Sequence, residues 1–107
     1  MIQNIYKEIE KYDVVIARAL AELRIYLELV TSLVKVNGDV IALKGSKAHE
    51  ELDAADNAIK KLGLSLNKIQ ASSLPNGEKR INLIFKKNSK TSPKYPRLYK
   101  DIIKKPL

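Results

Sequence analysis

The stretch Tyr12-Asp13-Val14-Val15-Ile16-Ala17-Arg18-Ala19 decides the fold. The apolar run 13–17 predicts a strand that is covered on both faces, and it leads directly into a segment with helical periodicity. Asn37 to Gly45 repeats the arrangement, with an expected strand at 39–43 that ends before Lys44. A strand, a crossover helix and a second strand form one parallel βαβ unit. The fold class is therefore α/β.

The segments around this unit predict the remaining elements. Apolar residues at three- and four-residue steps place the crossover helix after Arg18, and Asn37-Gly38 is expected to end it. A second helix is expected from an N-cap at Ser46 to Leu62, with Gly63 just beyond it. Residues 64–70 and 80–86 alternate, and the turn formers of 72–77 separate them. These two runs predict an antiparallel pair that extends the sheet.

Length and composition limit the classes of protein. A chain of 107 residues forms one domain, which we divide into a lead-in (1–11), a partial Rossmann-like domain (12–87) and a basic tail (88–107). The chain has no cysteine, so it has neither disulfides nor thiolate metal sites. It lacks a membrane-length apolar run and a signal-peptide pattern. We expect a soluble, cytoplasmic protein.

The positive charge is concentrated at one end. Residues 1–77 contain ten Lys and Arg and ten Asp and Glu, whereas residues 78–107 contain ten Lys and Arg against two acids. A neutral body with a basic tail is typical of a protein that binds a polyanion. Tyr95 and Tyr99 lie among these cations and could stack on bases. The alternative is a tail that is merely solvated.

Two cations follow the strands of the parallel unit. Arg18 and Lys44 come at the carboxyl ends of neighbouring strands, where open α/β sheets bind ligands. Arg18 can bind a carboxylate or phosphate through two donors, and Lys44 adds a point charge. The alternative is that Arg18 reaches solvent and Lys44 pairs with a nearby acid. The single histidine, His49, is expected at the surface without a chemical role, and no spacing suggests a metal site.

Three motifs occur in an order that resembles a known family. They are the 13–19 stretch, Ala42-Leu43-Lys44-Gly45, and Pro93-Lys94-Tyr95-Pro96-Arg97 before the basic end. Together they resemble the C-terminal half of the bacterial small-subunit rRNA (guanine-N7)-methyltransferase, the RsmG or GidB family. Members usually carry a glycine and a proline after the last motif, where this chain has 98–103 in their place.

The resemblance implies a Rossmann-like enzyme that transfers a methyl group from S-adenosylmethionine to guanine N7 in the 530 loop of 16S rRNA. Arg18 matches a cofactor-contacting arginine, and Lys44 matches the lysine of a Leu-Lys-Gly motif. The reaction needs little acid–base chemistry, because guanine N7 already has a free lone pair. We assign RNA binding to six residues: Lys44, Lys86, Lys87, Lys94, Tyr95 and Arg97.

The chain lacks a counterpart of the family's N-terminal half, including its glycine-rich cofactor loop. We therefore expect two parallel strands plus an antiparallel pair, with the 14–16 strand left at an open edge. That edge predicts self-association or a complementary N-terminal fragment. Two alternatives stay open: a noncatalytic RNA-binding remnant of the family, and an unrelated α/β interaction domain.

Overall fold

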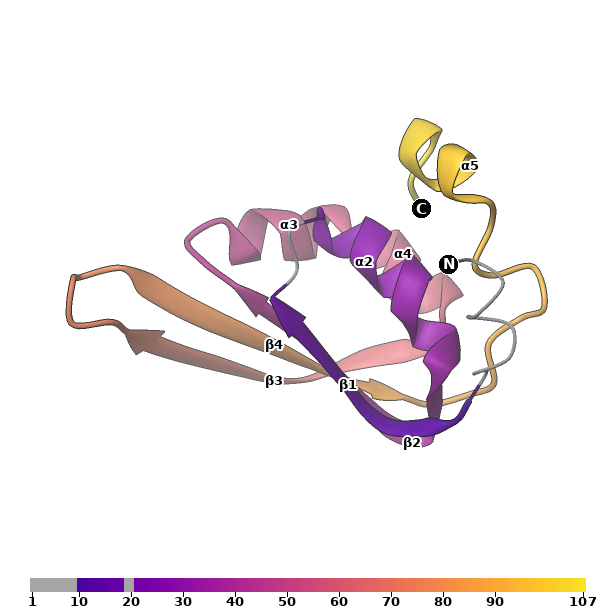
Figure 1. The fold of residues 1–107 in the computed structure, drawn as a ribbon, viewed down its shortest axis with the longest axis horizontal. Helices are drawn as coiled ribbons and strands as arrows, with labels where there is room; N and C mark the ends of the chain where they lie inside the picture. The colour runs from indigo at the N-terminus through magenta and orange to yellow at the C-terminus, as the bar shows by residue number, and fades with distance from the viewer. Residues whose placement is uncertain (1–9, 19–20) are drawn as a thin grey trace.

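The computed structural model describes residues 10–18 and 21–107 (Figure 1). Four strands and four α-helices follow one another along this part of the chain, and a short 3₁₀ helix at Thr31–Leu33 follows the first helix. In chain order the elements are β1 (Tyr12–Arg18), α2 (Leu23–Val30), β2 (Val34–Lys44), α3 (Ala48–Ala54), α4 (Asp56–Lys61), β3 (Leu64–Ser73), β4 (Lys79–Lys87) and α5 (Tyr99–Lys104).

The four strands form one sheet in the order β1-β2-β4-β3. β1 pairs with β2 in parallel, and β4 runs antiparallel to both β2 and β3. The crossover from β1 to β2 passes through α2, as a parallel pair requires. The predicted α/β class, with two parallel strands plus an antiparallel pair, is confirmed.

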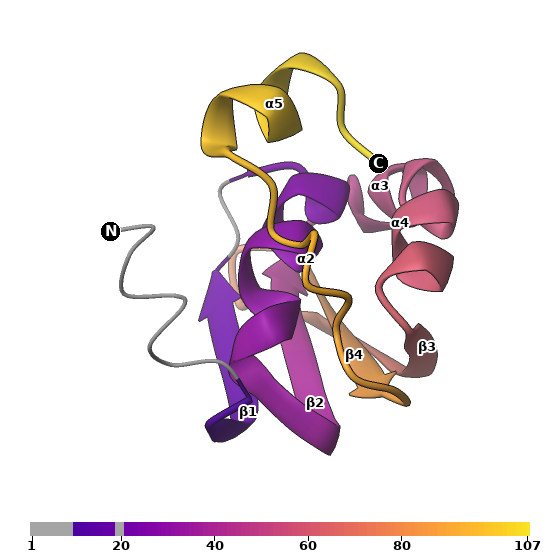
Figure 2. The same ribbon diagram turned by 90° about the vertical axis from the view of Figure 1, so that its right-hand side faces the viewer.

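Helices α2, α3 and α4 pack on one face of the sheet (Figure 2). The core lies between them: Leu23 and Leu27 of α2 meet Ala42 of β2 and the Leu83 and Phe85 side chains of β4, all fully buried. Burying side chains of this size contributes about 1.5–3 kcal/mol each. The strands alternate accordingly, with every second residue of β4 buried.

The expectation that the first strand is covered on both faces is wrong. Val15 and Ala17 pack against the core, whereas Val14 and Ile16 are 45% and 56% exposed. The reason is that the helices described here cover only one face of the sheet. β1 also lies at the edge of the sheet, where β2 is its only neighbour among the described strands.

The boundary between the crossover helix and β2 also differs from the prediction. The helix ends at Val30 rather than at Asn37-Gly38, and the strand begins at Val34. Pairing with β1 prevails over helical periodicity here, because Tyr12 lies opposite Val34 in the parallel ladder. Asn37 does adopt a positive φ of 72°, but inside β2, where the register between the two strands shifts.

Gly38 lies at this irregularity for a steric reason. A Cβ atom at this position would stand 2.5 Å from the Asp13 carbonyl oxygen and 2.6 Å from the Val34 side chain. Only glycine lets the two strands approach this closely.

The second predicted helix is divided in two. α3 and α4 meet at Ala55, whose N–H is shared between the Glu51 and Leu52 carbonyl oxygens. Ser46 is not the N-cap: Lys47 holds that position and its side chain makes no capping bond. Gly63, with φ 71°, follows α4 as predicted.

The predicted antiparallel pair is longer than expected, because the 64–70 and 80–86 runs extend to β3 and β4 around a tight turn at 74–78. The basic tail contains one helix, α5, over Tyr99–Lys104. No helix among the described residues is long and apolar enough to cross a membrane.

Lys87 is a fully buried lysine at the end of β4. Its Nζ donates hydrogen bonds to the carbonyl oxygens of Thr31 (3.1 Å) and Val34 (2.7 Å), and the Glu10 carboxylate lies 4.0 Å away. Burial lowers the pKa of Lys87 from its ordinary value of 10.5, and the charge of Glu10 partly opposes this shift. The ammonium thus satisfies backbone carbonyl groups at the carboxyl-terminal end of the helical segment 23–33.

The lowered pKa of Lys87 predicts a pH-dependent stability. Between the folded-state pKa and 10.5 the unfolded chain binds more protons, so the free energy of unfolding should rise with pH in that window. Ionisation of Tyr26 affects the free energy of unfolding only above pH 10, because burial raises the pKa of Tyr26 from 10.0 to about 12. Urea unfolding at a series of pH values up to about 10 measures the slope. Lys87→Met should flatten it and exposed Lys60→Met should not; an unchanged slope in Lys87→Met would contradict the assignment.

Candidate functional site

A shallow hollow of about 340 Å³ lies at the carboxyl ends of the two parallel strands. Arg18 ends β1 and Lys44 ends β2, and the ladder places Arg18 opposite Leu43. Both cations line this hollow. The topology of a parallel pair is the cause, because it brings both carboxyl ends to the same edge of the sheet.

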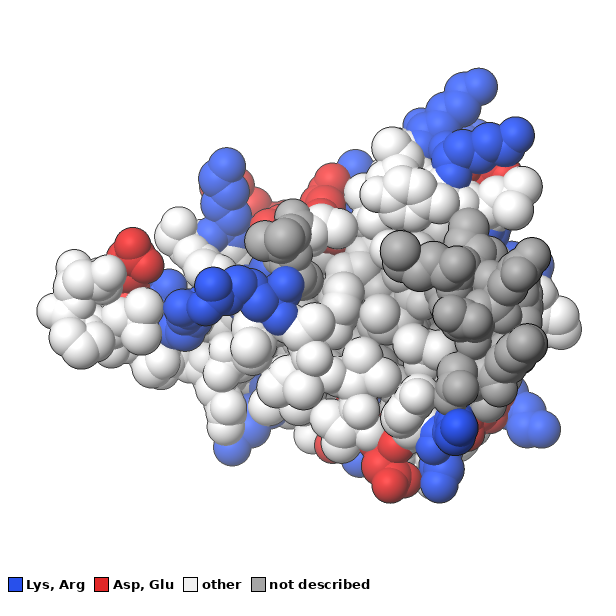
Figure 3. All heavy atoms as spheres, viewed as in Figure 1, with Lys and Arg blue, Asp and Glu red and all other residues white. Residues whose placement is uncertain are grey.

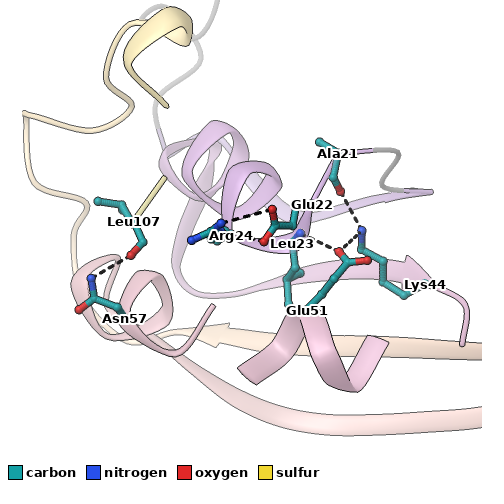
Figure 4. Close-up of polar contacts among 8 residues, drawn as sticks. All are labelled: Ala21, Glu22, Leu23, Arg24, Lys44, Glu51, Asn57 and Leu107. Atoms are coloured by element: carbon teal, nitrogen blue, oxygen red, sulfur yellow. Dashed lines mark hydrogen bonds and ion pairs between the residues drawn. The ribbon is translucent and has the colours of Figure 1, made fainter. Parts of the chain in front are cut away.

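The charged head of Lys44 is held inside the protein. Its side chain is 6% exposed, and Nζ lies 2.7 Å from Glu51 Oε1 and 2.8 Å from the Ala21 carbonyl oxygen (Figure 4). The same Glu51 oxygen accepts a hydrogen bond of 2.8 Å from the Leu23 backbone N–H. Lys44 and Glu51 therefore fasten the end of β2 to the start of α2 and to α3, and the predicted RNA contact of Lys44 stays a prediction.

Arg18 is differently placed. Its side chain is exposed, and no described residue forms an ion pair or hydrogen bond with the guanidinium. A guanidinium in this position can offer paired donors to a carboxylate or phosphate. Of the two cations predicted at this edge, Arg18 is the one whose geometry leaves its donors available.

Two further cations line the hollow that were not predicted from the sequence, Lys47 and Arg80. Lys47 precedes α3, and Arg80 is the second residue of β4, next to Ile81, which the antiparallel ladder sets opposite Lys44. Arg80 reaches this edge only because β4, and not β3, is the neighbour of β2. The position of Arg80 could not be predicted, because the sequence does not reveal the order of the strands in the sheet.

The charge of the hollow favours an anion. Arg18, Lys44, Lys47 and Arg80 line it, and Glu51 is the only carboxylate among the lining residues. Several cations around one concave surface raise the local concentration of anionic ligands. The Glu51 oxygen is already engaged by Lys44 and Leu23, so the cationic excess is available to a ligand.

Lys86 and Lys87 lie at the far end of the sheet from the hollow, because β4 is antiparallel to β2. Lys86 Nζ lies 3.1 Å from Asp39 Oδ1 and donates to the Asn37 carbonyl oxygen at 2.9 Å. Lys87 is buried, as described above. Both have intramolecular partners, and their assignment to RNA binding stays a prediction.

The motif 93–97 holds the tail to the body. Tyr95 is 7% exposed and belongs to the core, and Lys94 Nζ lies 5.3 Å from its ring centroid. Arg97 forms a bidentate pair with the buried Glu28 of α2: Nε to Oε2 is 3.0 Å and Nη2 to Oε1 is 2.8 Å. The hydrogen bonds that the Arg97 guanidinium donates to Glu28 raise the pKa of Arg97. The structure thus gives this motif a structural role, and its predicted RNA contacts are not tested by it.

Comparison with known proteins identifies the family. Residues 2–87 match the sequence model of GidB, rRNA small subunit methyltransferase G. A ribosomal RNA small subunit methyltransferase G from Pseudothermotoga lettingae is 45% identical over 98 residues, which cover 92% of this chain and 44% of that protein. The protein of the same name from Mycoplasma capricolum is 46% identical over 101 residues, 94% of this chain and 43% of that protein. The chain thus spans less than half the length of these relatives.

The fold has a counterpart of known structure. A chain in the crystal structure of the M1.HpyAVI–SAM complex superposes with a TM-score of 0.60, over 84% of this chain and 52% of that one, at 13% identity. This likeness shows the Rossmann-like arrangement of the sheet and its helices. The family follows from the sequence match over 2–87 and from the relatives at about 45% identity. This chain belongs to the GidB family, rRNA small subunit methyltransferase G.

Proposed function

We propose that this chain forms the carboxyl-terminal part of an rRNA methyltransferase, which transfers a methyl group from S-adenosylmethionine to guanine N7 in the 530 loop of small-subunit rRNA. The observation that carries the proposal is the cationic hollow at the ends of β1 and β2, in a chain of this family. Arg18 would contribute to the cofactor site, and Lys47 and Arg80 would bind anionic groups of the ligand or the RNA beside it.

The residues of the hollow fit one end of the cofactor. S-adenosylmethionine supplies an electrophilic methyl group, and its amino acid end carries a carboxylate that the exposed Arg18 guanidinium can bind through two donors. The lining residues have no neutral histidine or unengaged carboxylate that could act as a base. A guanine N7 lone pair needs none, so the residues would act by binding and orienting.

The proposal includes a partner for the edge of the sheet. β1 pairs with β2 alone among the described strands, and the Val14 and Ile16 side chains are exposed on the face of the sheet that the described helices leave uncovered. An unpaired apolar edge of this kind accepts a further strand. We propose that a complementary amino-terminal segment, or a second copy of the chain, covers it.

Calorimetric titration with S-adenosylmethionine tests the role of Arg18. We expect weak binding at millimolar ligand, and Arg18→Ala should weaken it about tenfold, because a hydrogen bond to a charged group contributes about 1.5–3 kcal/mol. Arg24→Ala is the control, since Arg24 pairs with Glu22 and does not line the hollow. Equal binding by Arg18→Ala and the unaltered chain would contradict the proposed cofactor contact.

A second candidate function is a noncatalytic RNA-binding member of the family. The observation in its favour is coverage: the chain spans 44% and 43% of its two relatives. In the same titration, binding of RNA without any heat from S-adenosylmethionine would support this candidate for the isolated chain.

A further inference from the structure

The helix α5 is a fixed part of the molecule. Ile102 is fully buried, and contacts hold the chain on both sides of the helix. Before it, Arg97 is paired with Glu28; after it, the Leu107 carbonyl oxygen accepts a hydrogen bond of 2.9 Å from Asn57 Nδ2 (Figure 4). These contacts fix which side of α5 faces outward.

The outward side of α5 is cationic and partly aromatic. At about 100° per residue, Lys100 and Lys104 point away from the buried Ile102 and, four residues apart, are neighbours on the helix surface. Tyr99 and Ile103 flank them and are 50% and 46% exposed. Figure 3 shows the resulting cluster of Lys and Arg side chains over α5, at the upper right of the molecule.

The cations of this face are not engaged within the protein. No ion pair or hydrogen bond joins the Lys100 or Lys104 side chain to another described residue. Asp101, the acid of this helix, is on the flank that faces Arg97. In the neighbouring motif the aromatic ring and the guanidinium are used in packing, so α5 is where the tail presents an accessible ring beside accessible cations.

We propose that the outer face of α5 (Tyr99, Lys100, Ile103 and Lys104) binds single-stranded RNA. The two ammonium groups contact successive phosphates, and the Tyr99 ring stacks on a base. The choice of RNA over another polyanion rests on the proposed function. The face itself goes beyond that function, because none of its four residues is among the six assigned to RNA binding from the sequence, and α5 lies outside residues 2–87, which match the family's sequence model.

The test is fluorescence anisotropy with a labelled single-stranded RNA oligonucleotide over a range of salt concentrations. For the unaltered chain, log affinity falls with log salt by about 0.7 for each phosphate contact. Lys100→Gln/Lys104→Gln removes two contacts, so the slope should become shallower by about 1.4. The control, Lys60→Gln/Lys61→Gln on α4, removes the same charge from another exposed helix and should change the slope less than half as much.

Tyr99 gives an independent reading. Tyr99→Ala should weaken binding about tenfold, whereas Tyr99→Phe keeps the ring and should bind like the unaltered chain. If the unaltered chain binds RNA and the α5 variants bind equally well with the same slope, the assignment to α5 is overturned while the proposed function stands. If the unaltered chain shows no RNA binding at low salt, the assignment to α5 is overturned as well, whereas the proposed function is decided separately by methyl transfer.

Discussion

Arg97→Ala should lower the free energy of unfolding by about 3–5 kcal/mol, because it leaves the Glu28 carboxylate buried without its cation. The Glu28 side chain has no exposed surface, and both of its oxygens accept hydrogen bonds from Arg97, one of them also from the Arg97 backbone N–H. A domain of this size has a total stability of about 5–15 kcal/mol. The substitution should therefore remove a large part of it, as urea unfolding would measure.

Two controls separate this pair from an ordinary surface contact. Arg24→Ala breaks a pair of similar length with Glu22, but both side chains are about one-third exposed, and the loss should be about 0–1 kcal/mol. Glu28→Met/Arg97→Met replaces both charges by apolar groups and should recover most of the stability. A loss in Arg97→Ala no larger than that in Arg24→Ala would contradict the structural role of the motif.

Much of the fold could be predicted from local pattern. The apolar runs around Val15 and Ile41 gave the parallel unit, and the alternation in 80–86 gave the antiparallel pair. The element boundaries could not be predicted, because pairing with β1 draws Val34–Val36 into a strand against their helical spacing. α5 depends on tertiary support in the same way: Ile102 and the Arg97–Glu28 pair hold a helix too short to be stable alone.

The site was predicted only in part. The rule that parallel strands share one edge found Arg18 and Lys44, but it could not say what each charged head contacts. The alternation of buried and exposed residues along the strands indicates which lysines point inward. Lys44 lies on the same side of β2 as the buried Val40 and Ala42, and Lys87 lies on the same side of β4 as the buried Leu83 and Phe85. Lysines in such rows point into the protein and need internal acceptors.

Methyl transfer should require the part of the enzyme that this chain does not span. We expect no incorporation by the chain alone, because β1 has β2 as its only partner among the described strands and the hollow can hold only one end of the cofactor. The missing part can be supplied as the segment of the Pseudothermotoga lettingae relative that lies outside the matched 98 residues. Adding this segment should cover the edge of β1 and complete the cofactor site. Methyl incorporation should rise from background without the segment to measurable turnover with it.

The decisive measurement is transfer of radiolabelled methyl from S-adenosylmethionine to small-subunit rRNA by the chain mixed with that complementary segment. We predict incorporation by the mixture and by neither part alone, lost in Arg18→Ala and kept in Arg24→Ala. If the intact relative is active in the same assay while the mixture incorporates no more methyl than its separate parts, the proposed function is contradicted.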